Sequence, residues 1–394
     1  MVTPLLDRLQ QSRYFTLAVL VFMAAYLCIP TAKWINSYFY AAIALPALIL
    51  FVLRTRLIDW RSPLLLLWLV FLAWFIVPGA RAEEGQFFKH ILYVLLFVLT
   101  VACLVDGDFF RRPGLVRLAF WVVCAYAVGS SLVFWLTGHY AVGQRVIHLP
   151  GRISNPIYVS IWMVCLGGLA APTWIRERRW IELLAAVVVS IVGISFALQT
   201  RTGLVGIGFL AALGVLFAFP RFPLRTLALV VLVSALIAGV VQVVHTEAWF
   251  VAFWGRADSG RIELFHFMIK DWESCGWWLG CGLGYQSHDL LHGTEAIQHP
   301  HNIFVSFGIY TGLVSLLIFG VLMLASLGAA LRQRDPWGLY LAVALLMLNF
   351  DGAKLIGNPD ELWPLVLLPA AMIVGAEVQR RRKLALGQAV PVQS

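Results

Sequence analysis

Long unbroken runs of apolar residues, such as 64–77 and 91–105, constrain this chain more than any other feature of its sequence. A helix needs about 20 mostly apolar residues to cross a bilayer, because an unpaired peptide group in hydrocarbon costs several kcal/mol. Hydrophobic residues make up 61% of the 394 positions and charged residues only 12%, which a soluble core of this size cannot accommodate. The sequence therefore predicts an all-α polytopic membrane protein.

About twelve transmembrane helices are expected. Because no small-residue cleavage site follows the first run, we interpret that run as a retained helix. The predicted organisation has helices 1–9 in residues 1–244, a large outer loop in 245–301, helices 10–12 in 302–378 and a basic tail in 379–394. The predicted spans are 14–31, 36–53, 62–78, 88–105, 115–137, 155–172, 180–198, 203–219, 225–244, 302–329, 336–351 and 362–378.

The distribution of Lys and Arg predicts the orientation of these helices. In this layout 19 of the 29 basic residues lie on the side of the two termini, and the other 10 are spread over longer loops on the opposite side. Cytoplasmic loops carry the excess of basic residues, so both termini are expected in the cytoplasm. The net charge of +9 follows from this asymmetry and does not indicate a nucleic-acid partner. The basic stretch at 379–383 is expected to anchor against anionic lipid headgroups.

The six cysteines fall into two groups. Four lie within predicted spans, where a thiol behaves as a small apolar group. The other two, Cys275 and Cys281, share the large outer loop, where either a disulfide or two free thiols is compatible with the sequence.

The predicted cytoplasmic connections are too short for a catalytic domain, and no phosphate-binding loop opens a cytoplasmic helix. These features exclude an ATP-driven pump and a cytoplasmic nucleotide-sugar transferase. All nine histidines instead fall on the predicted outer side. We therefore expect the chemistry of the protein on its outer face.

Three outer residues form the candidate catalytic set: Arg201, Arg261 and His301. Each arginine alone could reach lipid headgroups or a nearby acid, and a lone histidine at a helix end is often only interfacial. Together they suggest recognition of an anion beside a proton-transfer group, because guanidinium binds phosphate oxygens bidentately and imidazole titrates near neutral pH. His299 and His301 do not share a helix face, and no evident carboxylate supplies a third ligand, so no metal is expected.

Three short motifs carry a resemblance to a known family. The first is TRTG at 200–203, at the outer end of paired helices. The second is GR at 260–261, followed by Trp272 and the turn GCGLGY at 280–285. The third is His301-Asn302, with Gly312 ten residues after the asparagine. In order, spacing and membrane side this set resembles the O-antigen ligase/polymerase superfamily of bacterial inner-membrane glycan transferases, and the O-antigen ligases within it most closely.

The resemblance implies a GT-C-like architecture with a large periplasmic loop between helices 9 and 10. It implies an enzyme without a cofactor that transfers a glycan from undecaprenyl diphosphate to a sugar hydroxyl of lipid A-core. His301 would take the proton of the acceptor, and the two arginines would hold the diphosphate. Further residues are expected to contact substrate or to orient a basic group: Arg152, Arg145, Asn302, Gly282, Gly284, His299, Arg81, Lys89 and Asp351.

Two departures from the family pattern leave related branches open. Ser315 lies where Gly, Thr or Tyr is frequent, and Thr200 lies where Ser is common. An O-antigen polymerase and a protein O-oligosaccharyltransferase therefore remain alternatives within the superfamily. A lipid-linked glycan flippase or another transporter is the alternative of a different class, but it predicts ionisable residues within the spans and an internal repeat, and neither is evident.

Overall fold

The computed structural model describes residues 13–385, apart from 83–84, 288–289, 292–294, 297–298, 353 and most of 219–260. The described chain is almost entirely helical. Its first half contains α2 (Tyr14–Cys28), α3 (Ala32–Tyr38), α4 (Leu45–Leu53), α5 (Pro63–Trp74), α6 (Ile76–Arg81), α7 (Gly85–Leu104), α8 (Gly107–Phe110), α9 (Pro113–Leu136) and α10 (Pro156–Arg176). Its second half contains α11 (Trp180–Val192), α12 (Arg201–Ala218), α15 (Arg261–Cys275), α16 (Ile303–Gln333), α17 (Trp337–Met347), α18 (Leu368–Ala385) and the two-residue strands β1 (Leu290–Leu291) and β2 (Glu295–Ala296).

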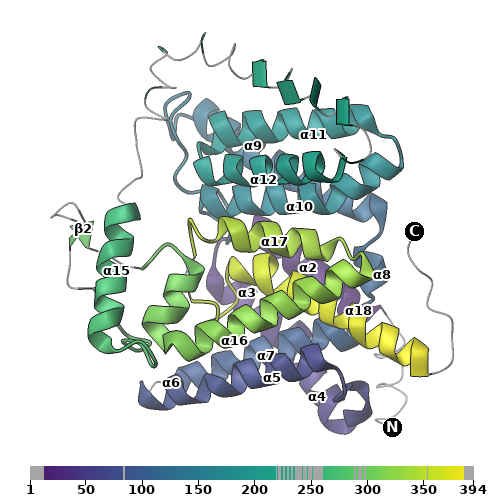
Figure 1. Cartoon of the computed structure of the whole chain (residues 1–394), viewed down its shortest axis with the longest axis vertical. Coiled ribbons are helices and arrows are strands. Elements are labelled where there is room, and N and C mark those ends of the chain that lie inside the picture. Colours follow the sequence, from purple (N-terminus) through teal and green to yellow (C-terminus); the bar gives the residue numbers. More distant parts are fainter. Residues whose placement is uncertain are drawn as a thin grey trace.

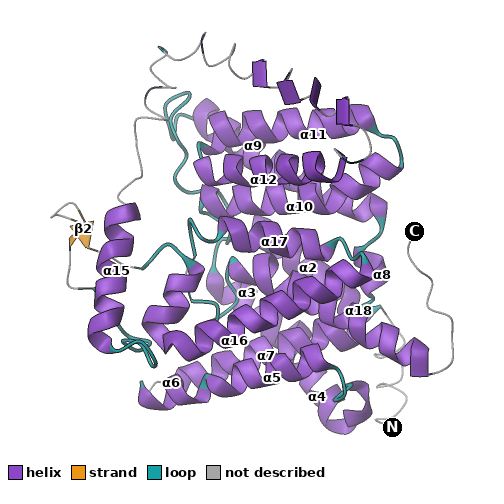
Figure 2. Ribbon diagram, in the orientation of Figure 1, coloured by secondary structure: helices purple, strands orange, loops and turns teal. Residues whose placement is uncertain are grey.

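The helices run alongside one another as a bundle, and α15 runs crosswise at one end of it (Figure 1). Loops gather at the two ends of the bundle (Figure 2). Among the described residues, eight helical stretches are long and apolar enough to cross a membrane, and two shorter apolar helices accompany them. The chain is therefore a multi-pass helical membrane protein, as its composition predicts. The count of twelve and the GT-C-like architecture stay predictions.

Every predicted span except 225–244 coincides with a helix or with helices joined end to end, and most of 225–244 lies outside the described residues. The second span begins earlier than predicted, at Ala32, and passes through a π-helical segment, Phe39–Ala44. The last helix continues to Ala385, so the basic tail predicted at 379–394 begins as a helix.

Close packing inside the bundle replaces the hydrophobic drive that lipid does not supply. Trp363 is fully buried, and its ring lies 4.9 Å from that of Phe39 and 4.8 Å from that of Phe97. At the centre, α10 contacts α9, α11, α12 and α17. Gly206 of α12 lies directly against Met347 of α17, where a larger residue would overlap the methionine sulfur.

Both ends of the described chain lie on one face of the bundle. Thr16, near the start of α2, accepts a hydrogen bond from the Asp106 amide at 2.9 Å. Gly107, which follows Asp106 in the chain, lies close to Gln379 near the end of α18. The opposite face carries the start of α16, the end of α17 and the crosswise helix α15 (Figure 1).

Helix α16 is kinked at Gly312, whose φ of 84° and ψ of 173° are not helical. The loop after α15 fits into this kink: the Leu313 amide donates to the Trp277 carbonyl at 2.8 Å, and the Cys281 amide donates to the Ile309 carbonyl at 2.6 Å. A β-carbon at position 312 would overlap the Trp278 carbonyl, so this position needs glycine for both conformation and space.

Candidate functional site

The centre of the candidate site is a histidine–carboxylate pair at the end of the bundle where α16 begins. The His301 Nδ1 lies 3.0 Å from the Asp351 Oδ1. Asp351 is 1% exposed, whereas the His301 side chain is 44% exposed. Because a carboxylate only accepts hydrogen bonds, Nδ1 donates to it, which leaves Nε2 as the ring nitrogen free to accept a proton.

Helix-capping asparagines hold this pair in place. Asn302 caps α16 by accepting hydrogen bonds from the Phe304 and Val305 amides at 2.9 and 3.1 Å. Its amide nitrogen donates to the Asn349 carbonyl at 3.0 Å, which ties the start of α16 to the end of α17. The polar atoms of the Asn302 side chain thus bond to the backbone and to the Asn349 side chain, and the contact with substrate expected for Asn302 stays a prediction.

A second cap reaches the same carboxylate from another helix. Asn155 caps α10 by accepting from the Ile157 amide at 2.9 Å, and its Nδ2 lies 3.5 Å from the Asp351 Oδ2. Three helices, α10, α16 and α17, therefore converge on Asp351.

Both predicted arginines lie at this end of the bundle, each in the first turn of a helix. Arg261 begins α15, and its guanidinium carbon lies 6.0 Å from the ring centroid of Phe350, the neighbour of Asp351. Arg201 begins α12 two residues after Gln199, whose backbone is left-handed with φ 49°. Because Gly206 packs against Met347, the first turn of α12 lies beside the end of α17 that leads to Asp351.

The predicted GCGLGY turn is built around a disulfide. The sequence left the pairing open, and the structure joins Cys275 to Cys281. Arg81 donates to the Gly280 carbonyl at 3.1 Å and so secures this turn against α6, and its expected contact with substrate stays a prediction. Gly284, near the end of this turn, lines a cavity.

That cavity has a volume of about 490 Å³ and adjoins the histidine pair. The His299 ring lies in its wall, with its centroid 3.9 Å from that of His301. Burial lowers the pKa of the His299 imidazole, the neighbouring His301 lowers it further, and the Asp351 carboxylate opposes both effects. The polar lining comes from seven residues: His90, Tyr285, Gln286, His299, Tyr310, Lys354 and Asp360.

The same residues form a group that could hold a metal ion. One ligand atom from each of His299, His301 and Asp351 lies within 4.8 Å of the other two. The expectation that no carboxylate lies near the two histidines is therefore wrong. Asp351 is 50 residues from His301 in the sequence, and only the packing of α17 beside α16 brings it there.

The remaining residues that were expected to contact substrate are Arg152, Arg145, Lys89 and Gly282. Arg152 pairs with Glu361 at 3.1 Å, and its backbone amide donates to the Tyr26 carbonyl at 2.9 Å. Arg145 is half-buried in the same loop. Lys89 is exposed on α7 with its ammonium 5.9 Å from the Tyr93 ring. Gly282, with φ 102°, lies in the turn after the disulfide and has open space where a side chain would be.

No protein-family model matches the chain. The chain is 23% identical to a protein of Pseudomonas aeruginosa named O-antigen ligase, over 358 residues that cover 88% of this chain and 86% of that protein. The chain resembles the O-antigen ligases. The resemblance first indicated by the three motifs is thus confirmed over most of the sequence.

Besides the residues of the three motifs, the cavity is lined by residues that the sequence analysis did not select. Lys354 donates to the Leu283 carbonyl, and its ammonium lies 4.2 Å from the Tyr310 ring centroid. Asp360 lies half-buried beside Glu361, and partial removal from water raises the pKa of both carboxyls. The signal in the sequence was a Lys and two adjacent acids in the outer segment between two predicted spans.

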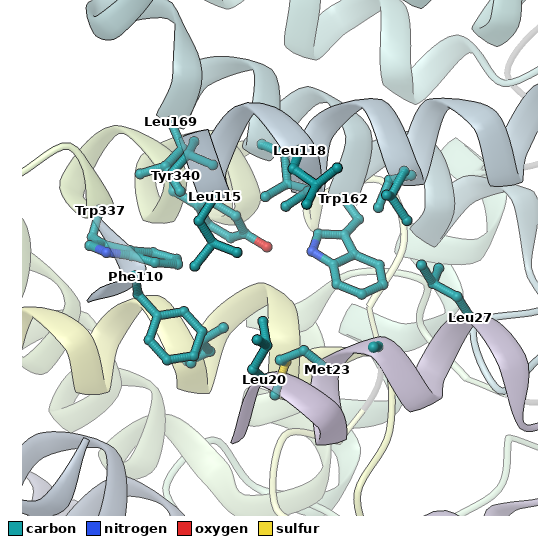
Figure 3. Close-up of a pocket in the computed structure, with 17 residues that line it drawn as sticks. Leu20, Met23, Leu27, Phe110, Leu115, Leu118, Trp162, Leu169, Trp337 and Tyr340 are labelled. Carbon is teal, nitrogen blue, oxygen red and sulfur yellow. The ribbon is translucent and has the colours of Figure 1, made fainter. Parts of the chain in front are cut away.

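A separate apolar groove of about 270 Å³ lies between α2, α9, α10, α17 and α18 (Figure 3). Trp337 and Phe110 line one end of it, and Leu27 lines the other. Leu27 follows Tyr26, whose carbonyl accepts from Arg152, so this end of the groove faces the candidate site. A wall of this chemistry suits a hydrocarbon chain.

Proposed function

We propose that this protein is an O-antigen ligase, an inverting glycosyltransferase that acts at the periplasmic face of the bacterial inner membrane. It transfers a glycan from undecaprenyl diphosphate to a sugar hydroxyl of lipid A-core in lipopolysaccharide biosynthesis. The observation that carries the proposal is the buried Asp351 carboxylate 3.0 Å from His301, at the end of the bundle where Arg201 and Arg261 begin their helices. The similarity to a protein named O-antigen ligase supports the same conclusion.

In the proposed reaction the acceptor hydroxyl attacks the anomeric carbon of the glycan. The Nε2 of His301 takes the hydroxyl proton, a role that contributes about 10²–10⁴-fold to a rate. Asp351 holds the imidazole in the required tautomer and stabilises the imidazolium that forms. The C–O bond to the diphosphate breaks as the new glycosidic bond forms, so the anomeric centre is inverted.

The leaving diphosphate needs stabilisation of negative charge. Arg261 and Arg201 are proposed to bind it bidentately, since guanidinium matches the geometry of phosphate oxygens. Both start a helix, where unpaired backbone N–H groups add to the positive potential. In this scheme the arginines supply the charge that a metal would supply elsewhere, so the reaction is proposed to be metal-independent.

The two substrates require different surroundings. The groove between α2 and α9 suits the prenyl chain of the donor, since its walls are apolar and one end faces the candidate site. The cavity lined by His299, Lys354 and Asp360 suits a sugar, since it offers both donors and acceptors of hydrogen bonds.

The test is ligation by purified protein reconstituted with an undecaprenyl-diphosphate-linked glycan and lipid A-core. We expect product without ATP and in the presence of a metal chelator. His301→Ala should reduce the rate by at least about 10²-fold. Arg261→Lys should also fail, because an ammonium cannot replace the bidentate fork.

The matched controls are His266→Ala, which removes an exposed histidine of α15, and Lys270→Arg on the same helix. Both should retain full activity. Full activity of His301→Ala and Arg261→Lys would disprove the assignment of the site, and loss of activity with chelator would disprove the metal-independent mechanism. Product of joined donor glycans without lipid A-core would identify a polymerase instead.

A further inference from the structure

A basic cavity lies at the opposite end of α16 from His301. Its volume is about 710 Å³, and three separate segments form its walls: the connection from α4 to α5, the end of α16 and the last turns of α18. Six arginines line it: Arg56, Arg61, Arg332, Arg380, Arg381 and Arg382. Among the described lining residues, only Asp59 and Glu377 carry negative charge, so the cavity is strongly positive.

Both carboxylates are already engaged by the protein. Glu377 accepts from the Arg381 Nε at 2.9 Å and from the Ser62 hydroxyl at 3.1 Å. Asp59 accepts from the backbone amide of Arg61 at 3.2 Å. These bonds leave most of the positive charge of the cavity without a compensating acid.

Two of the arginines fix the shape of the cavity. Arg381 donates to the Arg61 carbonyl at 3.2 Å, and Arg382 donates to the Leu57 carbonyl at 2.5 Å. They tie α18 to the α4–α5 connection across more than 300 residues of sequence. The cavity is therefore a built feature of the tertiary structure, beyond the general excess of basic residues on this face.

The other four arginines include one exposed side chain on each wall of the cavity that is available to a ligand. Within the described part of the chain, the side chains of Arg56, Arg332 and Arg380 make no hydrogen bond or ion pair, and all three are exposed. They come from the three different walls. A guanidinium fork binds phosphate oxygens bidentately, so three forks around one cavity suit a phosphate-bearing ligand.

Part of the rim of the cavity is apolar. Leu384, one of the lining residues, is 56% exposed, and the exposed side chains of Leu331 and Leu53 lie on the adjoining helix ends. A soluble anion would gain nothing from contact with apolar side chains, whereas a lipid presents a charged headgroup and hydrocarbon chains together. The end of a helical bundle is also where headgroups of a bilayer lie.

We propose that this cavity binds the phosphodiester headgroup of an anionic membrane phospholipid, with the acyl chains lying against the apolar rim. Basic pockets between helices on the positive face of membrane proteins have the chemistry for such headgroups. The bound lipid would connect the α4–α5 connection, α16 and α18 and so stabilise the end of the bundle opposite the candidate site. This inference does not depend on the proposed enzymatic activity.

The test measures lipid retention by native mass spectrometry and thermal unfolding in detergent, with the full chain and four probes. The probes are cardiolipin, phosphatidylglycerol, phosphatidylethanolamine and inorganic phosphate. Cardiolipin and phosphatidylglycerol should be retained and should raise the Tm, because a ligand that binds only the native state stabilises it. Phosphatidylethanolamine and inorganic phosphate should do neither at the same concentrations.

The variant Arg56→Gln/Arg332→Gln/Arg380→Gln should bind cardiolipin on the order of 100-fold more weakly. Its Tm without lipid should match that of the wild type, because the bonds of Arg381 and Arg382 stay intact. If this variant does not fold, the single variants Arg56→Gln and Arg380→Gln should each weaken binding about fivefold.

The matched control removes the same charge from the same face but outside the cavity: Arg13→Gln/Arg112→Gln/Arg176→Gln. It should bind cardiolipin like the wild type. Equal retention of cardiolipin by the wild type and the cavity variant would overturn the proposal. Stabilisation of the wild type by inorganic phosphate alone would identify a soluble anion as the ligand and would overturn the lipid assignment.

Discussion

His301 and Asp351 lie at the ends of two different helices, and the His301 Nδ1 is 3.0 Å from the Asp351 Oδ1. The histidine adopts a left-handed backbone with φ 50°, which is uncommon for a residue with a side chain. The next residue, Asn302, caps the start of α16, so the cap sets the direction of His301 relative to the helix. Local backbone, cap and carboxylate thus cooperate to orient one imidazole.

Asp351→Asn should reduce ligation by about 10²-fold or more. An asparagine amide can donate to Nδ1, which places the proton on Nε2 and removes the proposed base. The measurement is the rate of glycan transfer in the reconstituted system, with Asp108→Asn, an exposed acid at the other end of the bundle, as the control. Equal rates for Asp351→Asn and the wild type would show that Asp351 does not orient His301.

Gly312→Ala should destabilise the protein, while Gly320→Ala on the same helix should not. Position 312 has φ 84°, and a β-carbon there would overlap the Trp278 carbonyl. At Gly320 a β-carbon has nothing within 4 Å. We expect a loss of about 1–3 kcal/mol for the first variant, measured as a lower Tm in detergent. A similar Tm for both variants would mean that the loop does not depend on the kink.

Arg111→Ala should lower stability far more than Arg112→Ala. Arg111 forms a bidentate pair with Asp335 at 3.2 and 2.5 Å, and the Asp335 side chain is 4% exposed. Removing one partner of such a pair leaves an uncompensated buried charge, which costs about 3–5 kcal/mol. Thermal unfolding of the two variants provides the comparison, since Arg112 is exposed and its guanidinium lies over the Phe109 ring. Equal losses would indicate that the Arg111–Asp335 pair contributes little to stability.

The stability of the folded protein should fall as the pH rises, because of the half-buried carboxyl of Asp360. Burial raises the pKa of Asp360, and the neighbouring Glu361 raises it further. The folded protein then holds this proton more tightly than the unfolded chain does. The stabilisation is therefore full below the unfolded pKa of about 3.9 and is lost as the pH rises through the folded pKa, at a slope of at most about 1.4 kcal/mol per pH unit.

Asp360→Asn should flatten this dependence between about pH 5 and pH 8. The substitution keeps the side-chain oxygen that accepts from the Leu362 amide at 2.9 Å. The measurement is the Tm as a function of pH, with Glu273→Gln, an exposed acid of α15, as the control. A slope for Asp360→Asn that equals the wild-type slope would exclude Asp360 as the titrating group.

The sequence motifs led to several of the residues now found together. His301, Asn302 and Asp351 were selected from motif order and from the predicted ends of spans. The helix caps explain part of this success, because Asn155-Pro156 and Asn302 mark helix starts that local chemistry sets. Asp351, however, was selected only to orient an unspecified basic residue, and its partner was not foreseen.

Other features could not be read from the sequence, since they depend on contacts between distant segments. The fit of the Trp277–Cys281 loop into the kink at Gly312 is one example. Two more are the hydrogen bond from Arg81 to the Gly280 carbonyl of that loop and the one from Lys354 to the Leu283 carbonyl. A sequence shows that these residues are polar and lie outside the spans, but it does not show which backbone carbonyl each one reaches.

The sequence by itself determined the helical membrane class, the approximate limits of most spans and the resemblance to O-antigen ligases. These depend on the length and polarity of continuous segments and on short motifs, which lipid and backbone hydrogen bonding constrain locally. Only the tertiary structure decided that Asp351 meets His301, that Cys275 pairs with Cys281 and that six arginines surround one cavity. Those relationships arise from how helices pack, and packing depends on the shapes of side chains that are far apart in the chain.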